Sequence, residues 1–92
     1  MKAETNTGTK ILNLAQVPAK STVRITDIVG GWGVRQTLIQ LGINVGDVVL
    51  VKRNSTFGGP VLISFNNSDV AIGRGMAQKI FVEIIDNGAL HA

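Results

Sequence analysis

Short runs of β-branched residues, separated at brief intervals by glycine, asparagine, serine and proline, limit the possible folds of this chain more than any other feature. β-branched side chains fit the pleated surface of a strand, whereas the separating residues favour turns. A βαβ arrangement would instead need helical segments of about 10–15 residues between the runs. The pattern therefore predicts an all-β domain of short strands joined by tight turns.

Five of these runs have the length and residue types of strands. They span residues 22–29, 47–53, 61–65, 70–72 and 80–85. In the second run, residues 48–51 are apolar on both faces, so we expect both sides of this strand to be covered. Asn66 and Asn67 tolerate positive φ angles, which predicts a tight turn between the third and fourth runs. In the first run, Asp27 interrupts the alternation and indicates a bulge or the end of the strand.

One segment has the period of a helix instead of a strand. Val34, Leu38 and Leu41 fall at positions i, i+4 and i+7, which places them on one helix face. Gly42 follows, at the position where helices commonly end in the left-handed conformation. We therefore expect a short helix from Val34 to Leu41 that caps one end of a small, partly closed barrel. Residues 75–79 favour a second helical turn.

Length and composition bound the organisation of the chain. Its 92 residues suffice for one domain, and 45% hydrophobic with 16% charged residues excludes a disordered chain. We expect the domain to span residues 12–86, between a flexible tail at residues 1–11 and a second tail at residues 87–92. Cysteine is absent, and no apolar run has the length of a signal peptide or a membrane-spanning helix. These features favour a folded protein of the reducing cytosol.

Few residues in this chain could support catalysis. The only histidine, His91, is second from the C-terminus, where it cannot be held against a nucleophile. The acidic residues of the expected domain lie beside predicted turns or on outer strand faces, which disfavours a catalytic carboxylate pair. The chain also offers no clustered ligands for a metal ion. The sequence thus predicts a protein that is not an enzyme and has no evident cofactor.

Several residues are candidates for contacts with a ligand or a partner. The glycines around Trp32 would let backbone amides approach a phosphate, but the Lys-Ser/Thr ending of a Walker loop is missing. Trp32 either covers the core or presents its ring to a partner, and both interpretations stay open. Ile39 lies off the apolar helix stripe, where it could belong to an exposed docking patch. Lys52 and Arg53 lie near a loop with Phe57, as on some surfaces for single-stranded nucleic acid, but aromatic residues are only 4% of the chain.

Four segments carry a more specific signal. They are residues 38–49, 59–61, 70–74 and 77–82. The most specific part is a short helix that ends in Leu41, Gly42 and Ile43 and is followed three residues later by Gly46 and a β-branched strand. Together, these segments resemble the FeoA-like ferrous-iron transport proteins, over residues 12–85. The resemblance implies a mainly β, five-stranded SH3-like barrel, which is shared with the C-terminal domain of metal-dependent repressors.

The resemblance also implies a role. It indicates a cytoplasmic accessory protein that binds the membrane transporter FeoB, which has a cytosolic G domain, and modulates iron transport or its GTPase activity. Ferrous iron or another transition metal is implied as a ligand by the resemblance alone. The chain departs from the family at Thr37, where arginine is common, and at Gly59, where an acidic residue is common. The partner surface could therefore differ from that of other members.

Within this framework, the helix and its entry are the expected partner surface. The predicted contacts are Trp32 as an anchor, Arg35 and Gln40 as polar contacts, Ile39 as an apolar contact, and Lys52 and Arg53 as second-choice contacts on the neighbouring strand. Binding would recruit the protein to the inner face of the membrane, and exposed strand edges would permit self-association. Two alternatives stay open: a metal-responsive or peptide-binding regulatory domain, and a basic nucleic-acid-binding barrel, although no nucleic acid is expected.

Overall fold

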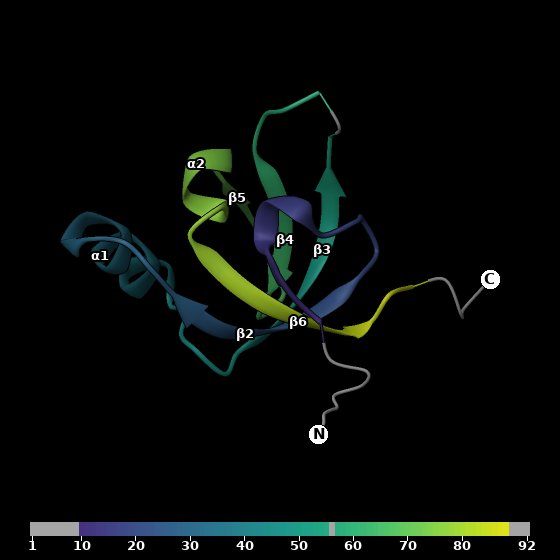
Figure 1. Cartoon of the computed structure of the whole chain (residues 1–92), viewed down its shortest axis with the longest axis horizontal. Helices are drawn as coiled ribbons and strands as arrows, with labels where there is room; N and C mark the ends of the chain where they lie inside the picture. Colours follow the sequence, from purple (N-terminus) through teal and green to yellow (C-terminus); the bar gives the residue numbers. More distant parts are fainter. Residues whose placement is uncertain (1–9, 56, 89–92) are drawn as a thin grey trace, which may run out of the picture.

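The strands of the chain form one antiparallel sheet that bends around an apolar interior. The computed structural model describes residues 10–55 and 57–88, which contain β1 (Ile11–Asn13), the 3-10 turn η1 (Leu14–Gln16), β2 (Thr22–Ile28), α1 (Trp32–Leu41), β3 (Val48–Asn54), β4 (Val61–Phe65), β5 (Ser68–Ile72), α2 (Arg74–Ala77) and β6 (Ile80–Asp86). The strand order is β1-β6-β2-β3-β4-β5, and the sheet is not closed. β2 and β6 run across the view in Figure 1, whereas the antiparallel strands β3 and β4 lie along its vertical direction. The predicted mainly β class is confirmed.

The inner face of the bent sheet carries the hydrophobic core. Its buried side chains are mostly β-branched: Val17, Val23, Ile25, Ile28, Ile43, Val49, Val51, Val61, Ile63, Ile72, Ile80 and Val82, with Leu14, Leu38 and Ala77. Stiff β-branched side chains fill the small interior with little loss of rotamer freedom. Because the chain has no disulfide, burial of this apolar area is the main stabilising contribution in a domain of this size.

The five predicted strands correspond to β2, β3, β4, β5 and β6, and their bounds agree to within two residues. Asn66 and Asn67 have φ angles of 53° and 64°, so the tight turn between β4 and β5 is confirmed. The register between β2 and β6 shifts between Ile25 and Asp27, which confirms a bulge at this point. Local alternation and turn residues therefore predict most of the sheet correctly.

The sequence does not predict β1. This strand is defined by its pairing with β6, in which Ile11 lies opposite Glu83 and Leu12 opposite Val82. Its three residues are too few to show an alternating pattern. β1 begins at Ile11, the last residue of the segment expected as a flexible tail. Residues 1–9 of that tail and residues 89–92 of the C-terminal tail lie outside the described residues.

The outer face of β3 differs from the prediction. Val49 and Val51 are buried, but Val48 is 46% exposed and Leu50 is 38% exposed. The latter two side chains alternate with the buried ones and therefore lie on the outside of the bend. The expectation that this strand is covered on both sides is wrong, because an apolar run does not specify a second element to pack on it.

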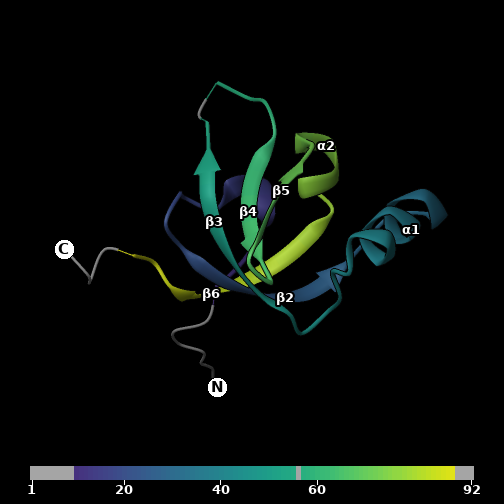
Figure 2. The same cartoon turned by 180° about the vertical axis from the view of Figure 1, so that it is seen from behind.

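The helix α1 starts two residues before the expected position and stands out from the sheet, as Figures 1 and 2 show from opposite sides. Gly42 ends it with a φ angle of 79°, as expected. Leu38 is buried and Val34 packs against the core, as the predicted apolar stripe requires. Leu41 is exposed, so the prediction that it belongs to this stripe is wrong. The helix therefore lies beside one end of the barrel and does not cap it. The second helical turn is α2, which starts one residue earlier than expected, at Arg74.

Candidate docking surface

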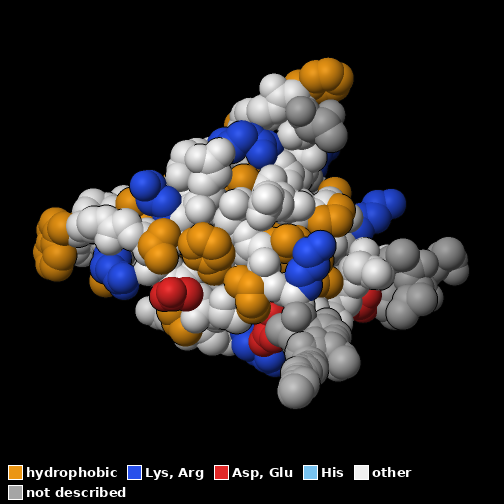
Figure 3. Space-filling model, in the orientation of Figure 1, with side chains coloured by type: hydrophobic (Ala, Val, Ile, Leu, Met, Phe, Trp, Pro, Cys, Tyr) orange, Lys and Arg blue, Asp and Glu red, His pale blue; other side chains and the backbone are white. Residues whose placement is uncertain are grey.

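The helix α1 presents large apolar side chains to solvent. Trp32 is 75% exposed and Ile39 is 61% exposed. This exposure excludes the interpretation of Trp32 as a cover of the core. Figure 3 shows hydrophobic side chains at the outer end of α1, at the left of the molecule. Exposed apolar groups that gather on one projecting element are typical of interaction sites.

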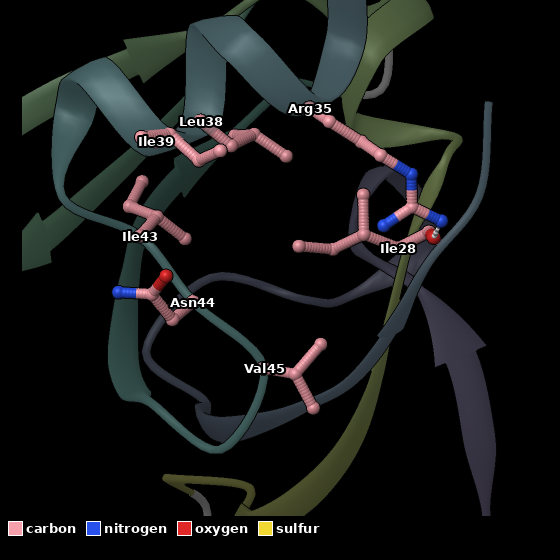
Figure 4. Close-up of a pocket in the computed structure, with 7 residues that line it drawn as sticks. All are labelled: Ile28, Arg35, Leu38, Ile39, Ile43, Asn44 and Val45. Atoms are coloured by element: carbon pink, nitrogen blue, oxygen red, sulfur yellow. Dashed lines mark hydrogen bonds between the residues drawn. The ribbon is translucent and has the colours of Figure 1, made fainter. Parts of the chain in front are cut away.

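A hollow of about 190 Å³ lies between α1, the end of β2 and the loop that leads to β3. It is lined by Ile28, Arg35, Leu38, Ile39, Ile43, Asn44 and Val45. Ile28, Leu38 and Ile43 are buried and form its floor, whereas Ile39 and Val45 are exposed at its rim. Figure 4 shows side chains from the helix, the strand and the loop arranged around the same space. These seven lining residues together with Trp32 are termed the α1 surface.

Local hydrogen bonds hold the loop opposite α1 in place. The backbone N–H of Asn44 donates to Oδ2 of Asp47 at 2.7 Å, which closes a turn within the loop. The N–H of Gly46 donates to the carbonyl oxygen of Ile25 at 2.8 Å and ties the loop to β2. Gly46 has a φ angle of 98°, a conformation that favours glycine. This turn keeps Val45 at the rim of the hollow.

Arg35 places a positive charge beside the hollow. Its Nη2 donates to the carbonyl oxygen of Ile28 at 2.8 Å, a bond drawn in Figure 4. The guanidinium has further N–H donors, and the side chain is exposed. α1 contains no acidic residue that could neutralise this charge within the helix. The α1 surface therefore combines apolar groups with a cation, which suits a partner segment that carries apolar and acidic side chains.

Three of the predicted contacts share one face of α1. Trp32, Arg35 and Ile39 follow one another at positions i, i+3 and i+7. Gln40 is exposed on the same helix but does not line the hollow. The structure therefore brings the predicted anchor, one polar contact and the apolar contact together.

Lys52 and Arg53 lie apart from that group, at the end of β3 that is distant from its connection to α1. The register between β3 and β4 shifts between Val51 and Arg53, which indicates a bulge, and both basic side chains are exposed. Lys52 Nζ pairs with Asp69 Oδ2 at 3.0 Å. Within the described part of the chain, Arg53 makes no ion pair. These two residues are therefore not part of the α1 surface.

Sequence reasoning missed the residues that the fold brings to α1 from elsewhere. Val45 carries a usable signal, because it is an apolar residue between Asn44 and Gly46 in a turn. Ile28 carries none, because it has the pattern of an ordinary inward-facing strand residue. The hollow itself depends on how α1 leaves β2, which no local pattern specifies.

Charged groups in the described residues serve mainly in pairs and turns. Arg24 Nη1 donates to Glu83 Oε2 at 2.8 Å across β2 and β6. Among residues 10–55 and 57–88, no three His, Cys, Asp or Glu side chains gather where they could hold a metal ion. His91 lies outside this part of the chain. None of the helices that the structure describes is long and apolar enough to cross a membrane.

Comparison with known sequences gives a consistent result. The model of the FeoA domain matches residues 12–84. A protein of Methanocaldococcus jannaschii that is provisionally named Fe(2+) transport protein A is 46% identical over 66 residues, which cover 72% of this chain and 78% of that protein. The matched region contains α1 and almost the whole sheet.

Comparison with solved structures agrees with the match to the FeoA domain. A crystal structure of an iron uptake regulatory protein (FeoA) has 28% identity and a TM-score of 0.73, covering 83% of this chain and 99% of that chain. The NMR structure of a FeoA-like protein from Clostridium acetobutylicum has 26% identity and a TM-score of 0.74, covering 84% of this chain and 90% of that chain. A manganese-dependent transcriptional repressor shares the fold, with 18% identity, a TM-score of 0.77, and coverage of 84% of this chain and 43% of that chain.

The FeoA structures have an SH3-like fold, and the open six-stranded sheet of this protein is compatible with a small SH3-like barrel. The predicted SH3-like fold and the resemblance found in the sequence are both confirmed. The chain therefore belongs to the FeoA family.

Proposed function

We propose that this protein is a cytoplasmic accessory protein of ferrous-iron transport that binds a FeoB-type membrane transporter through the α1 surface and modulates transport or its GTPase activity. The proposal is supported by the family, whose named relatives include an Fe(2+) transport protein A. The observation that carries the mode of action is an apolar hollow with an exposed rim on a helix that stands out from the barrel. In this role Fe²⁺ is the cargo of the transporter, and the protein acts as an adaptor and not as an enzyme.

The size of the hollow favours a macromolecular partner over a small molecule. Pockets for small ligands usually have volumes of about 300–1,000 Å³. The hollow on α1 measures about 190 Å³, which accommodates one or two side chains of a partner. The α1 surface also contains residue types that dominate binding energy at protein interfaces, namely the exposed Trp32 and Arg35.

The residues of the α1 surface suit a partner segment with one apolar and one acidic side chain. An apolar side chain of the partner would enter the hollow against Leu38 and Ile43 and cover Ile39 at the rim. Trp32, at the start of α1, would be covered by a neighbouring part of the partner. Arg35 would pair with an acidic group beside that apolar anchor, since it has free N–H donors and no carboxylate on its own helix. Truncating such a central anchor typically weakens an interface by about 2 kcal/mol or more.

A binding titration with the purified full-length transporter in detergent tests this proposal. Ile39→Asp should weaken binding by about tenfold or more, because it places an uncompensated charge at the rim of the hollow. Val48→Asp is the matched control, because it makes the same kind of change at an exposed apolar residue on β3. Circular dichroism of both variants checks that they are folded.

The possible outcomes separate the proposal from its competitors. Loss of binding in Ile39→Asp with nearly unchanged binding in Val48→Asp supports docking through α1. Equal losses in both variants, or no binding of the wild-type protein to the full-length transporter, contradict it. The similarity to the manganese-dependent transcriptional repressor, at 18% identity, supports a shared fold and not a shared function.

A further inference from the structure

The loop between β3 and β4 ends in a single, fully exposed aromatic side chain. Phe57 is 98% exposed, more than any other large hydrophobic residue that the structure describes. Gly58 and Gly59 follow with φ angles of 98° and 86°, in the left-handed region that favours glycine. The loop projects beyond the sheet at the top of Figure 1, and a hydrophobic group forms its tip in Figure 3. Phe57 therefore makes no contribution to the core.

Arg74, at the start of α2, ties the base of this loop together. Its Nε donates to the carbonyl oxygen of Gly59 at 3.0 Å, and its Nη2 donates to the carbonyl oxygen of Ser55 at 2.9 Å. Nη2 also donates to Oδ1 of Asn54 at 2.6 Å, and Nη1 donates to the carbonyl oxygen of Ala15 at 3.2 Å. One guanidinium thus holds both sides of the loop. A loop that is fixed at its base loses less conformational entropy when its tip binds a surface.

The hairpin that carries Phe57 is cationic. No acidic residue occurs in the sequence between Asp47 and Asp69. Lys52 and Arg53 lie at the end of β3 that leads into the loop. Lys52 is paired with Asp69, but Arg53 is exposed and has no ion-pair partner among the described residues. The apolar tip therefore stands on a base that attracts negative charge.

The shape of this feature favours a lipid surface over a protein. A specific protein interface buries about 800 Å² on each partner, and the two glycines beside Phe57 add no side-chain area. A lipid surface needs no shape complementarity: an aromatic ring can enter the boundary between headgroups and acyl chains, while nearby arginine and lysine side chains bind anionic headgroups. We propose that Phe57 and Arg53 form a contact site for an anionic phospholipid surface.

This contact is separate from the α1 surface. Arg53 lies at the end of β3 that is distant from the connection to α1, so the two surfaces use different elements. With one ring and one unpaired cation, the lipid contact alone is weak, and it would orient a protein that another interaction brings to the membrane. The lipid contact itself needs no protein partner, so it can be tested on the isolated protein even if the proposed binding to the transporter fails.

NMR spectroscopy of the full-length protein with lipid nanodiscs tests the proposal at the strength expected. One nanodisc contains equal parts phosphatidylglycerol and phosphatidylcholine, the other only phosphatidylcholine, and both carry a trace of gadolinium-chelating lipid. The backbone amides of Gly58 and Gly59 should relax at least about threefold faster with the anionic nanodisc than with the neutral one. Phe57→Ser and Arg53→Gln should each reduce that difference, whereas Ile39→Asp, on α1, should leave it unchanged.

The outcomes of the nanodisc experiment either support or overturn the lipid site. Selective relaxation at Gly58 and Gly59 that depends on phosphatidylglycerol and on Phe57 supports the lipid site. Equal relaxation with both nanodiscs, no enhancement at these glycines, or an enhancement centred on Trp32 overturns it. Persistence of the effect in Phe57→Ser also overturns it, provided that the core amide signals of this variant match those of the wild-type protein. If these glycine signals respond to the soluble domain of a protein partner and not to lipid, the loop is a protein contact.

Discussion

Replacing Arg74 with alanine should strongly destabilise the fold, because one guanidinium joins η1, the end of β3 and the β3–β4 loop. The bonds to Ser55 and Gly59 are exposed, so water replaces them in the variant at little cost. The bonds to Ala15 and Asn54 are partly buried, and hydrogen bonds from charged donors contribute about 1.5–3 kcal/mol each. The Ala15 carbonyl keeps a second donor, Nδ2 of Asn54 at 2.9 Å. The free energy of unfolding should therefore fall by roughly 2–4 kcal/mol.

Unfolding in guanidinium chloride, followed by far-UV circular dichroism, measures this loss. The corresponding fall in Tm is roughly 10–25 °C for a domain of this size. Arg53→Ala is the matched control, since it removes an exposed arginine without an ion-pair partner among the described residues, and it should change the free energy of unfolding by less than about 0.5 kcal/mol.

Two results would contradict this role of Arg74. One is a loss below about 1 kcal/mol in Arg74→Ala, or a loss no larger than that of Arg53→Ala. The other is full wild-type stability in Arg74→Lys. This variant keeps the charge but lacks the planar fork that reaches several acceptors at once, so full recovery would assign the effect to charge and not to geometry.

Further predictions concern α1 and the sheet. Leu38→Ala should lower the free energy of unfolding by about 2–5 kcal/mol in chemical denaturation, since this side chain is buried between α1 and the barrel, and a loss below about 1 kcal/mol would contradict that packing. Gly42→Ala should lower the free energy of unfolding by about 1 kcal/mol, because alanine is strained at the φ angle of 79°. Gly33→Ala, inside the helix and with open space at its Cβ position, should leave the free energy of unfolding unchanged or raise it by up to about 1 kcal/mol. Arg24→Ala should lower the free energy of unfolding by less than about 1 kcal/mol, because the ion pair of Arg24 with Glu83 is partly exposed. The stability difference between this variant and the wild-type protein should shrink in high salt, which screens the pair.

Elements that follow from local patterns could be predicted from the sequence. The alternation in β4 and β6, the turn at Asn66 and Asn67, and the helix end at Gly42 each depend on neighbouring residues only. β1 could not be predicted in this way, because its three residues become a strand through pairing with β6, far along the chain. The exposure of Leu50 had the same cause: whether an apolar strand face is covered depends on elements that lie distant in sequence.

The candidate site shows the same division. Ile39 could be predicted as exposed because it lies off the apolar stripe of its own helix. The sequence could not decide whether Trp32 lies in the core or at the surface, because its exposure depends on how far α1 stands from the sheet. Ile28 and Val45 join the hollow only when β2 and the loop after α1 are folded, and the role of Arg74 depends on acceptors up to 59 residues away.

Binding of the transporter through α1 is the proposal on which the role of this protein depends. A photo-crosslinking amino acid placed at residue 39 in living cells tests it most directly, with the same group at residue 48 on the outer face of β3 as the reference. Both positions are exposed and apolar, so neither substitution should disturb the core. We expect a crosslinked product with the membrane transporter from residue 39 and little or none from residue 48. Equal products from both positions, or a product from residue 48 alone, would contradict it.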